Sequence, residues 1–126
     1  MILDTNAVSG ILAGEAGLES ILASAKRHEL PVIVIGEYRF GLIGLGKKGA
    51  RLQMLFDRLV SESVLLEVDE TTAHYYASIR HELKVKGHPI PENDIWIAAL
   101  ARQHELAIVS RDPHFDAVEG NRRRSW

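Results

Sequence analysis

The chain opens with MILDTN, residues 1–6, in which two apolar residues run directly into a carboxylate. Ile2 and Leu3 predict a short buried strand that ends at Asp4, and residues 6–13 predict a helix. An aspartate in front of a helix caps its free backbone N–H groups, so the strand can pass into the helix without a long loop. A strand followed by a helix is the unit from which α/β folds are built.

Further apolar runs along the chain predict the remaining strands. Residues 32–35 (VIVI), opened by Pro31, form an unbroken β-branched run of the type that is buried on both faces of a parallel sheet. Residues 64–68 and the short aliphatic run at 107–109 predict two further strands. The closing residues 123–126 predict a brief edge strand.

The segments between these runs predict helices. Helices are expected over residues 17–28, over 47–61 and over 92–105, the last with Pro91 at a first helical position. Another helix is expected to begin at a turn formed by Gly36, with Glu37 in its first turn. A long helix is expected from a cap at Asp69 or Thr71 to residue 86. Strands that alternate with helices pair in parallel through right-handed crossovers. We therefore expect an α/β fold, a three-layer α/β/α sandwich with a short parallel sheet of four to five strands.

Composition limits the class of protein. At 126 residues and 46% hydrophobic, the chain is expected to form one domain over residues 1–126. The absence of cysteine excludes disulfides, a thiolate zinc site and a cysteine nucleophile. No apolar run approaches the ~20 residues that span a bilayer, and no basic and apolar leader precedes Ile2. We expect a cytoplasmic protein without membrane contact.

Charge is informative only locally, because the net charge of −2 indicates no polyanionic partner for the whole chain. Residues 38–56 hold four cations and no acid, namely Arg39, Lys47, Lys48 and Arg51, and a second basic group lies at residues 122–124. Such patches either bind phosphates or simply form a solvated helix face, and the sequence leaves both interpretations open.

Four acids carry the functional signal: Asp4, Glu37, Asp94 and Asp112. Three of them follow predicted strands, and Asp94 opens the helix before the strand at 107–109. Loops beyond the carboxyl ends of parallel strands converge on one crevice, so these acids are expected to meet there if the helix of Asp94 also starts near it. Converged carboxylates repel each other unless a cation lies between them, and oxygen ligands favour a hard divalent ion such as Mg²⁺ or Mn²⁺.

Each acid taken alone also has a purely structural explanation, as a helix cap, a partner of the helix dipole or a turn residue. Neither His88 nor His114, the histidines nearest the expected crevice, is expected to take part in catalysis. Nucleotide-binding glycine loops, a serine-nucleophile motif and a helical His pair for zinc are all absent.

The motifs around the acids, in their order along the chain, resemble those of the PIN-domain nucleases. These motifs are MILDTN at the start, E-x-x-x-G from Glu37, P-x-x-D-x-x-I-A-A around Asp94 and S-x-D-x-H-F from Ser110. Within that family the chain resembles the compact VapC-type toxins of bacterial toxin–antitoxin modules, over residues 1–126.

The resemblance implies an endoribonuclease dependent on Mg²⁺ or Mn²⁺ that cleaves single-stranded or loop RNA. Asp4, Glu37, Asp94 and Asp112 match the family's acidic site, with Asn6 and Ser110 as secondary members. The fourth acidic position is the family's most variable, so Asp116 is an alternative to Asp112. Gly36 stands where the family usually has a serine or threonine, which removes one possible hydroxyl contact. Arg39, Lys47 and Arg51 are candidates for an RNA-binding rim.

The resemblance also implies a cognate antitoxin and a homodimer as partners. One alternative is a catalytically silent PIN-fold subunit that only completes an antitoxin repressor complex. A receiver-like phosphoacceptor domain also gathers acids at strand ends, but it needs a late lysine, and no lysine follows Lys86.

Overall fold

A five-stranded sheet with the order β3-β2-β1-β4-β5 forms the centre of the molecule. The computed structural model describes residues 1–126, and every strand pairs in parallel with its neighbours. The strands are β1 (Ile2–Leu3), β2 (Glu29–Pro31), β3 (Val64–Leu66), β4 (Ile108–Val109) and β5 (Arg123–Arg124). The predicted parallel sheet is confirmed, including the edge strand near the end of the chain.

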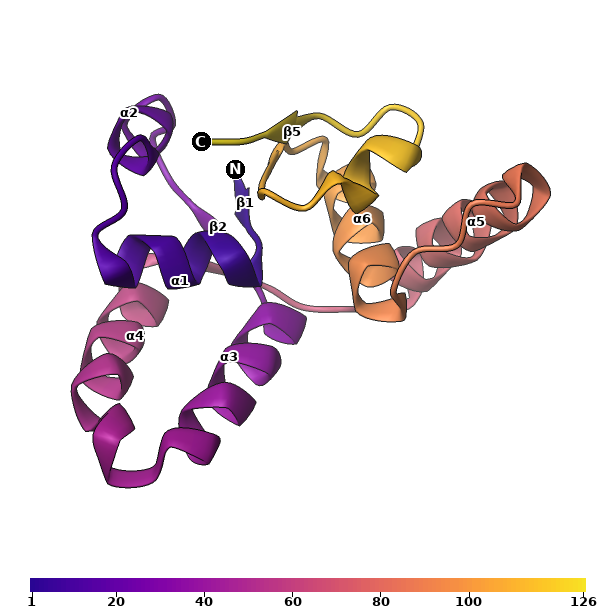
Figure 1. Ribbon diagram of the computed structural model, residues 1–126. Coiled ribbons are helices and arrows are strands. Elements are labelled where there is room, and N and C mark those ends of the chain that lie inside the picture. The colour runs from indigo at the N-terminus through magenta and orange to yellow at the C-terminus, as the bar shows by residue number, and fades with distance from the viewer.

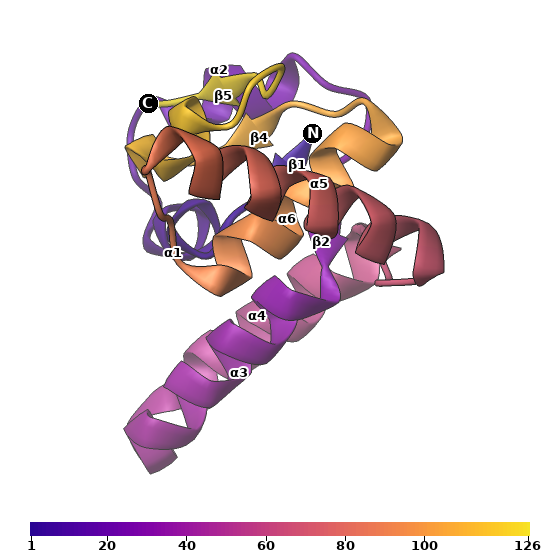
Figure 2. The ribbon, with the colours of Figure 1, turned by 90° about the vertical axis from the view of Figure 1, so that its right-hand side faces the viewer.

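Helices flank the sheet on both sides, as predicted. They are α1 (Thr5–Ala13), α2 (Leu18–Ala23), α3 (Val32–Leu45), α4 (Ala50–Glu62), α5 (Glu70–Lys86) and α6 (Glu92–His104), with 3₁₀ turns η1 (Gly46–Gly49) and η2 (Pro113–Ala117). Helices α3 and α4 run back to back as a hairpin that projects from the body, while α5 packs along α6 on the other side of β1 (Figures 1 and 2). None of the helices combines the length and the apolarity needed to cross a membrane.

The expected strand at residues 32–35 is wrong, because these residues form the first turn of α3. Strand β2 lies directly before these residues, and in it Leu30 pairs with Leu65 and Pro31 with Leu66. Periodicity cannot separate a buried strand from a buried helix in so short an apolar run. The apolar pattern did not predict β2, because a strand that contains Glu29 is not expected to be buried. The Glu29 side chain is nevertheless only 2% exposed, since its carboxylate pairs with Arg27 and with the Met1 ammonium group.

This shift moves the elements that follow. Gly36 lies inside α3 and makes no turn, and Glu37 sits in the second helical turn instead of the first. Helix α2 is shorter than the predicted 17–28, because the chain must extend by Glu29 to enter the sheet. Helix α4 begins at Ala50, since the glycine-rich segment before it forms η1.

The later elements follow their sequence signals closely. Helix α5 starts with Asp69 as its cap, whose carboxylate accepts a hydrogen bond from the Thr72 backbone N–H at 2.9 Å. It ends at Gly87, whose φ of 65° is the left-handed conformation that glycine adopts without strain. The proline before α6 is its cap and not its first residue.

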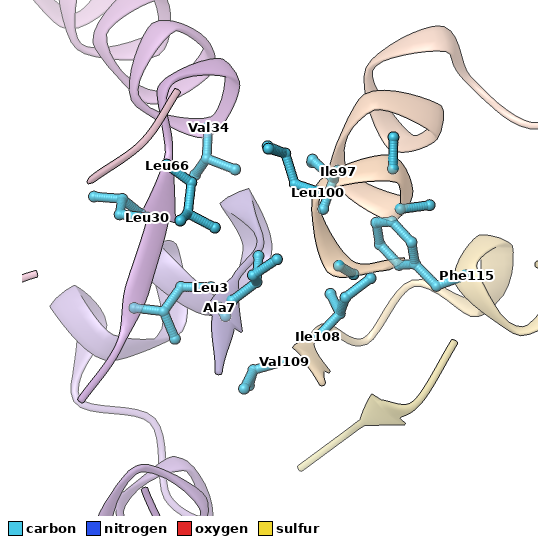
Figure 3. Packing of buried hydrophobic residues seen from close by; sticks show 14 of the residues in the cluster. Leu3, Ala7, Leu30, Val34, Leu66, Ile97, Leu100, Ile108, Val109 and Phe115 are labelled. Atoms are coloured by element: carbon cyan, nitrogen blue, oxygen red, sulfur yellow. The ribbon is translucent and has the colours of Figure 1, made fainter. Parts of the chain in front are cut away.

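The hydrophobic core joins both layers of helices to the sheet. Leu3 of β1, Leu30 of β2 and Val34 of α3 face Ile97 and Leu100 of α6 (Figure 3). On the other side of α6, Phe115 of η2 is fully buried against the same cluster and lies close to Ile108 of β4 (Figure 3). The core therefore fixes the starts of α1, α3 and α6 and the turn after β4 relative to one another.

Candidate active site

Asp4 stands at the carboxyl end of the central strand and is held by a dense set of hydrogen bonds. Because β1 and β4 are parallel neighbours, Ser110, which follows β4, lies beside Asp4. The Ser110 hydroxyl donates to Asp4 Oδ2 at 2.7 Å, and the Asn6 amide donates to the same oxygen at 3.1 Å. The Thr5 backbone N–H donates to Oδ1 at 2.7 Å. The carboxylate is thus a helix cap and, at the same time, fixed in place at 5% exposure.

Asn6 and Ser110 connect Asp4 to the turn that carries Asp112. The Ser110 hydroxyl accepts a hydrogen bond from the Asp112 backbone N–H at 2.9 Å, and the Asn6 side-chain oxygen Oδ1 accepts one from the Arg111 backbone N–H at 3.1 Å. The two residues given a secondary role from the sequence therefore join the start of α1 to the end of β4.

Asp94 and Asp112 meet through a histidine. Asp94 lies in the first turn of α6, and Asp112 caps η2 by accepting the His114 backbone N–H at 2.9 Å. The Nδ1 atom of His114 lies 2.9 Å from Asp94 Oδ2 and 2.9 Å from Asp112 Oδ1. The helix of Asp94 thus starts at the crevice, which spacing alone did not guarantee.

Glu37 reaches the same crevice from the second turn of α3. Its Oε1 atom and the nearby Thr5 hydroxyl are buried, and neither has a hydrogen-bond partner of regular geometry. The Thr5 side chain is the neighbouring donor: as a hydrogen-bond partner it lowers the pKa of Glu37 and opposes the rise that burial causes.

Burial and mutual repulsion set the electrostatics of the cluster. Burial raises the pKa of Asp4 most, the charges of Asp94 and Asp112 add to the rise, and the Ser110 and Thr5 hydrogen bonds oppose it. Burial likewise raises the pKa of Glu37, with further contributions from Asp4 and Asp94. For Asp94, burial and the charge of Asp112 raise the pKa, and the His114 hydrogen bond opposes them. In all three cases burial is the largest cause, and the neighbouring carboxylates add to it.

The donor set fits a divalent cation. Carboxylates from four separate elements converge, two of them in a group with His114 whose ligand atoms all lie within 4.8 Å of one another. An ion placed there would neutralise the repulsion between the carboxylates. Asp4, Glu37, Asp94, Asp112 and His114 are the side chains able to hold it.

The structure places the other candidates outside the carboxylate cluster. Asp116, the alternative to Asp112, forms a paired contact with Arg123 at 2.8 and 2.7 Å and is 53% exposed. Arg39 pairs with Asp57 of α4 at 3.0 Å and lies over the ring of Phe56. Lys47 and Arg51 are exposed at the tip of the α3–α4 hairpin, at the end of α3 opposite to the one nearest the sheet (Figures 1 and 2).

His114 is the site residue that sequence reasoning discounted. Two signals were available: its position two residues after Asp112, and its place in the S-x-D-x-H-F motif that begins at Ser110. A histidine in such a turn is usually exposed and unremarkable, and only the approach of α6 brings its ring between two carboxylates.

Comparisons with known proteins agree with this geometry. A model of the PIN domain family matches residues 1–121. Toxin FitB of Neisseria gonorrhoeae is 34% identical over 125 residues, covering 89% of this chain and 87% of that protein. Ribonuclease VapC5 of Mycobacterium tuberculosis is 28% identical over 120 residues, covering 94% and 87%. The crystal structure of FitAcB from N. gonorrhoeae superposes with a TM-score of 0.86 at 31% identity, over 98% of this chain and 96% of that one.

Proposed function

The chain belongs to the PIN-domain family, and we propose that residues 1–126 form a single domain acting as a metal-dependent endoribonuclease, the toxin of a toxin–antitoxin pair. The observation that carries the proposal is the converged acidic crevice with its buried Glu37 oxygen. The names of the relatives, a ribonuclease and a toxin, support the reaction and the biological role. Helix capping and turn formation can explain each acid alone, but they do not require four carboxylates to lie close together.

Each acid has a separate proposed role in the reaction. Asp4 and Asp94 hold the principal cation, which we propose to be Mg²⁺ or Mn²⁺, and Asp112 contributes directly or through water. When bound, the cation supplies Lewis acidity to a phosphodiester and neutralises charge that builds up on it. Glu37 is a further ligand or the general base, since Oε1 is free to accept a proton from an attacking water and its raised pKa suits that task.

Single-stranded or loop RNA is the proposed substrate. The crevice lies between the starts of three helices and the turn after β4, and an unpaired strand can bend its backbone into such a site where an A-form duplex cannot. Lys47 and Arg51 are exposed and free to contact the flanking strand, whereas Arg39 must first leave Asp57. These three remain the candidates for phosphate contact.

An RNA cleavage assay with purified full-length protein tests the activity. We expect cleavage of a labelled single-stranded RNA in Mg²⁺ or Mn²⁺, little cleavage of the matching duplex, and none in EDTA. Cleavage that persists in EDTA would refute the metal site. A folded protein that cleaves no RNA under any metal condition would instead favour the alternative function, a silent subunit of an antitoxin repressor complex.

The α3–α4 hairpin is the proposed partner surface. Phe40 and Ile43 of α3 are 79% and 80% exposed, and Met54 of α4 is 74% exposed. Large apolar side chains grouped in this way are typical of interaction surfaces. A cavity between α1 and α3, on another face of α3, is lined by residues that include Thr5, Glu37 and Leu42. We propose that an antitoxin segment crosses it and places a basic side chain near the carboxylates, and that the hairpin also supports a homodimer.

Replacing Phe40 by Asp is expected to weaken both antitoxin binding and self-association. An apolar anchor at the centre of an interface is worth at least about 2 kcal/mol, or roughly 30-fold in affinity. Val85→Asp is the matched control, because Val85 is 72% exposed on α5, away from the hairpin. Sedimentation velocity with and without antitoxin measures both associations. Equal affinities in the two variants would exclude the hairpin, and a tight complex that still cleaves RNA would exclude inhibition by the antitoxin.

A further inference from the structure

His114 forms, with Asp94 and Asp112, the group of side chains whose ligand atoms lie close enough together to share one cation. Its Nδ1 atom is 2.9 Å from one carboxylate oxygen of Asp94 and 2.9 Å from one of Asp112. Two adjacent ligands of an octahedral ion with bonds of about 2.1 Å lie about 3.0 Å apart. The two separations, which are also ordinary hydrogen-bond lengths, would allow Nδ1 and the two oxygens to bind one ion.

The protein holds the ring in this position from several directions. The His114 backbone N–H is bound to Asp112 Oδ1, and the next residue, Phe115, is fully buried in the core. Arg123 ties the rest of the turn to the sheet, since its guanidinium group pairs with Asp116 and donates to the Ser110 carbonyl at 3.1 Å. The ring is 41% exposed, so the side from which solvent or substrate approaches stays open.

We infer that His114 supplies a nitrogen ligand to the divalent cation and that the site consequently prefers Mn²⁺ to Mg²⁺. This inference rests on the proposed metal-dependent function. Mg²⁺ takes oxygen ligands almost exclusively, whereas imidazole nitrogen is a good ligand for first-row transition metals. A site made only of Asp4, Glu37, Asp94 and Asp112 has no such basis for discrimination. Without metal, Nδ1 donates its proton in a hydrogen bond to the Asp94 carboxylate; to ligate the ion, the imidazole would bind through the Nδ1 lone pair and carry its proton on Nε2.

Mn²⁺ itself is a suitable probe, because it is paramagnetic and a directly bound nitrogen leaves a ¹⁴N coupling in its pulsed electron paramagnetic resonance spectrum. We expect this coupling in the Mn²⁺ complex of the wild-type chain and its loss in His114→Gln. His88→Gln is the matched control, since His88 is an exposed histidine outside the group formed by Asp94, Asp112 and His114. That variant should keep the coupling.

Calorimetric titration gives a second readout that does not depend on catalysis. In His114→Gln the Mn²⁺ dissociation constant should rise at least about tenfold, the lower end of what losing even a supporting partner of a ligand costs. The Mg²⁺ dissociation constant should change far less. His88→Gln should match the wild type for both ions.

The outcomes separate this inference from the function on which it rests. Two outcomes would refute His114 as a nitrogen ligand while leaving the metal site intact. In the first, wild-type protein binds Mn²⁺ without a ¹⁴N coupling. In the second, the His114→Gln variant keeps both the coupling and the wild-type Mn²⁺ affinity. Equal losses of Mn²⁺ and Mg²⁺ affinity overturn the preference. Protein that binds neither ion overturns the proposed metal site itself, and with it this inference.

Discussion

Asp94→Asn and Asp4→Asn are each expected to lower the rate of RNA cleavage by on the order of 10²-fold or more, because each removes the charge of a principal metal ligand. The fold should survive both changes. Asn at position 4 can still accept the Thr5 N–H that Asp4 Oδ1 accepts, and Asn at position 94 can still accept a hydrogen bond from His114. Cleavage rates at saturating Mn²⁺, together with circular dichroism spectra, measure the effect.

Asp116→Asn is the matched control for this loss. It makes the same chemical change two residues beyond His114, but the carboxylate it removes is already paired with Arg123 and half exposed. We expect near wild-type cleavage from Asp116→Asn and a clear loss from Asp112→Asn. The reverse order would assign the fourth acidic position to Asp116, and full activity in Asp4→Asn or Asp94→Asn would refute the proposed site.

Divalent cation is expected to raise the stability of the folded protein substantially. A ligand that binds only the folded state stabilises it by roughly 2.7 kcal/mol at a concentration 100 times its dissociation constant. The site cannot exist in the unfolded chain, because its carboxylates come from four elements that separate on unfolding. Differential scanning fluorimetry with Mg²⁺ or Mn²⁺ against EDTA measures the change in Tm, and a Tm indifferent to millimolar amounts of both ions would contradict the site.

The Asp94→Asn variant tests the same electrostatics without metal. In EDTA it should melt at or above the wild-type temperature and respond less to Mg²⁺. Because burial and Asp112 raise the pKa of Asp94 in the folded state, its ionised form destabilises the fold at neutral pH. This penalty disappears once the pH falls below the ordinary pKa of aspartate, where the residue is protonated in both states.

The advantage of Asp94→Asn should therefore be largest at neutral pH and shrink as the pH is lowered through the folded-state pKa. Fluorimetry of the two proteins over a pH series in EDTA gives this difference directly. A variant that is much less stable than wild type in EDTA at neutral pH would mean that Asp94 serves the fold as an ordinary first-turn carboxylate and carries no unrelieved repulsion.

Local signals were sufficient where residue chemistry alone decides the structure. The strand-to-helix passage at Asp4, the cap at Asp69 and the stop at Gly87 each depend on a few neighbouring residues. The first and the last were predicted, and Asp69 was one of the two predicted caps, the other being Thr71. The parallel sheet also followed, because alternating strands and helices permit few other arrangements. Residues 32–35 failed for the opposite reason: strand and helix both bury a β-branched run, and the pairing of β2 with β3 decided between them.

The sequence by itself determined the α/β class and supplied the acids and their order along the chain, since apolar periodicity, caps and turns act over a few residues. Only the tertiary structure decided how these acids combine. The parallel pairing of β1 with β4 sets Ser110 against Asp4, and the packing of α6 on the core brings Asp94 to His114 and Asp112. Such contacts join residues up to 106 positions apart in the sequence. Contacts between residues so far apart are fixed by the burial of the whole core and not by any local sequence pattern.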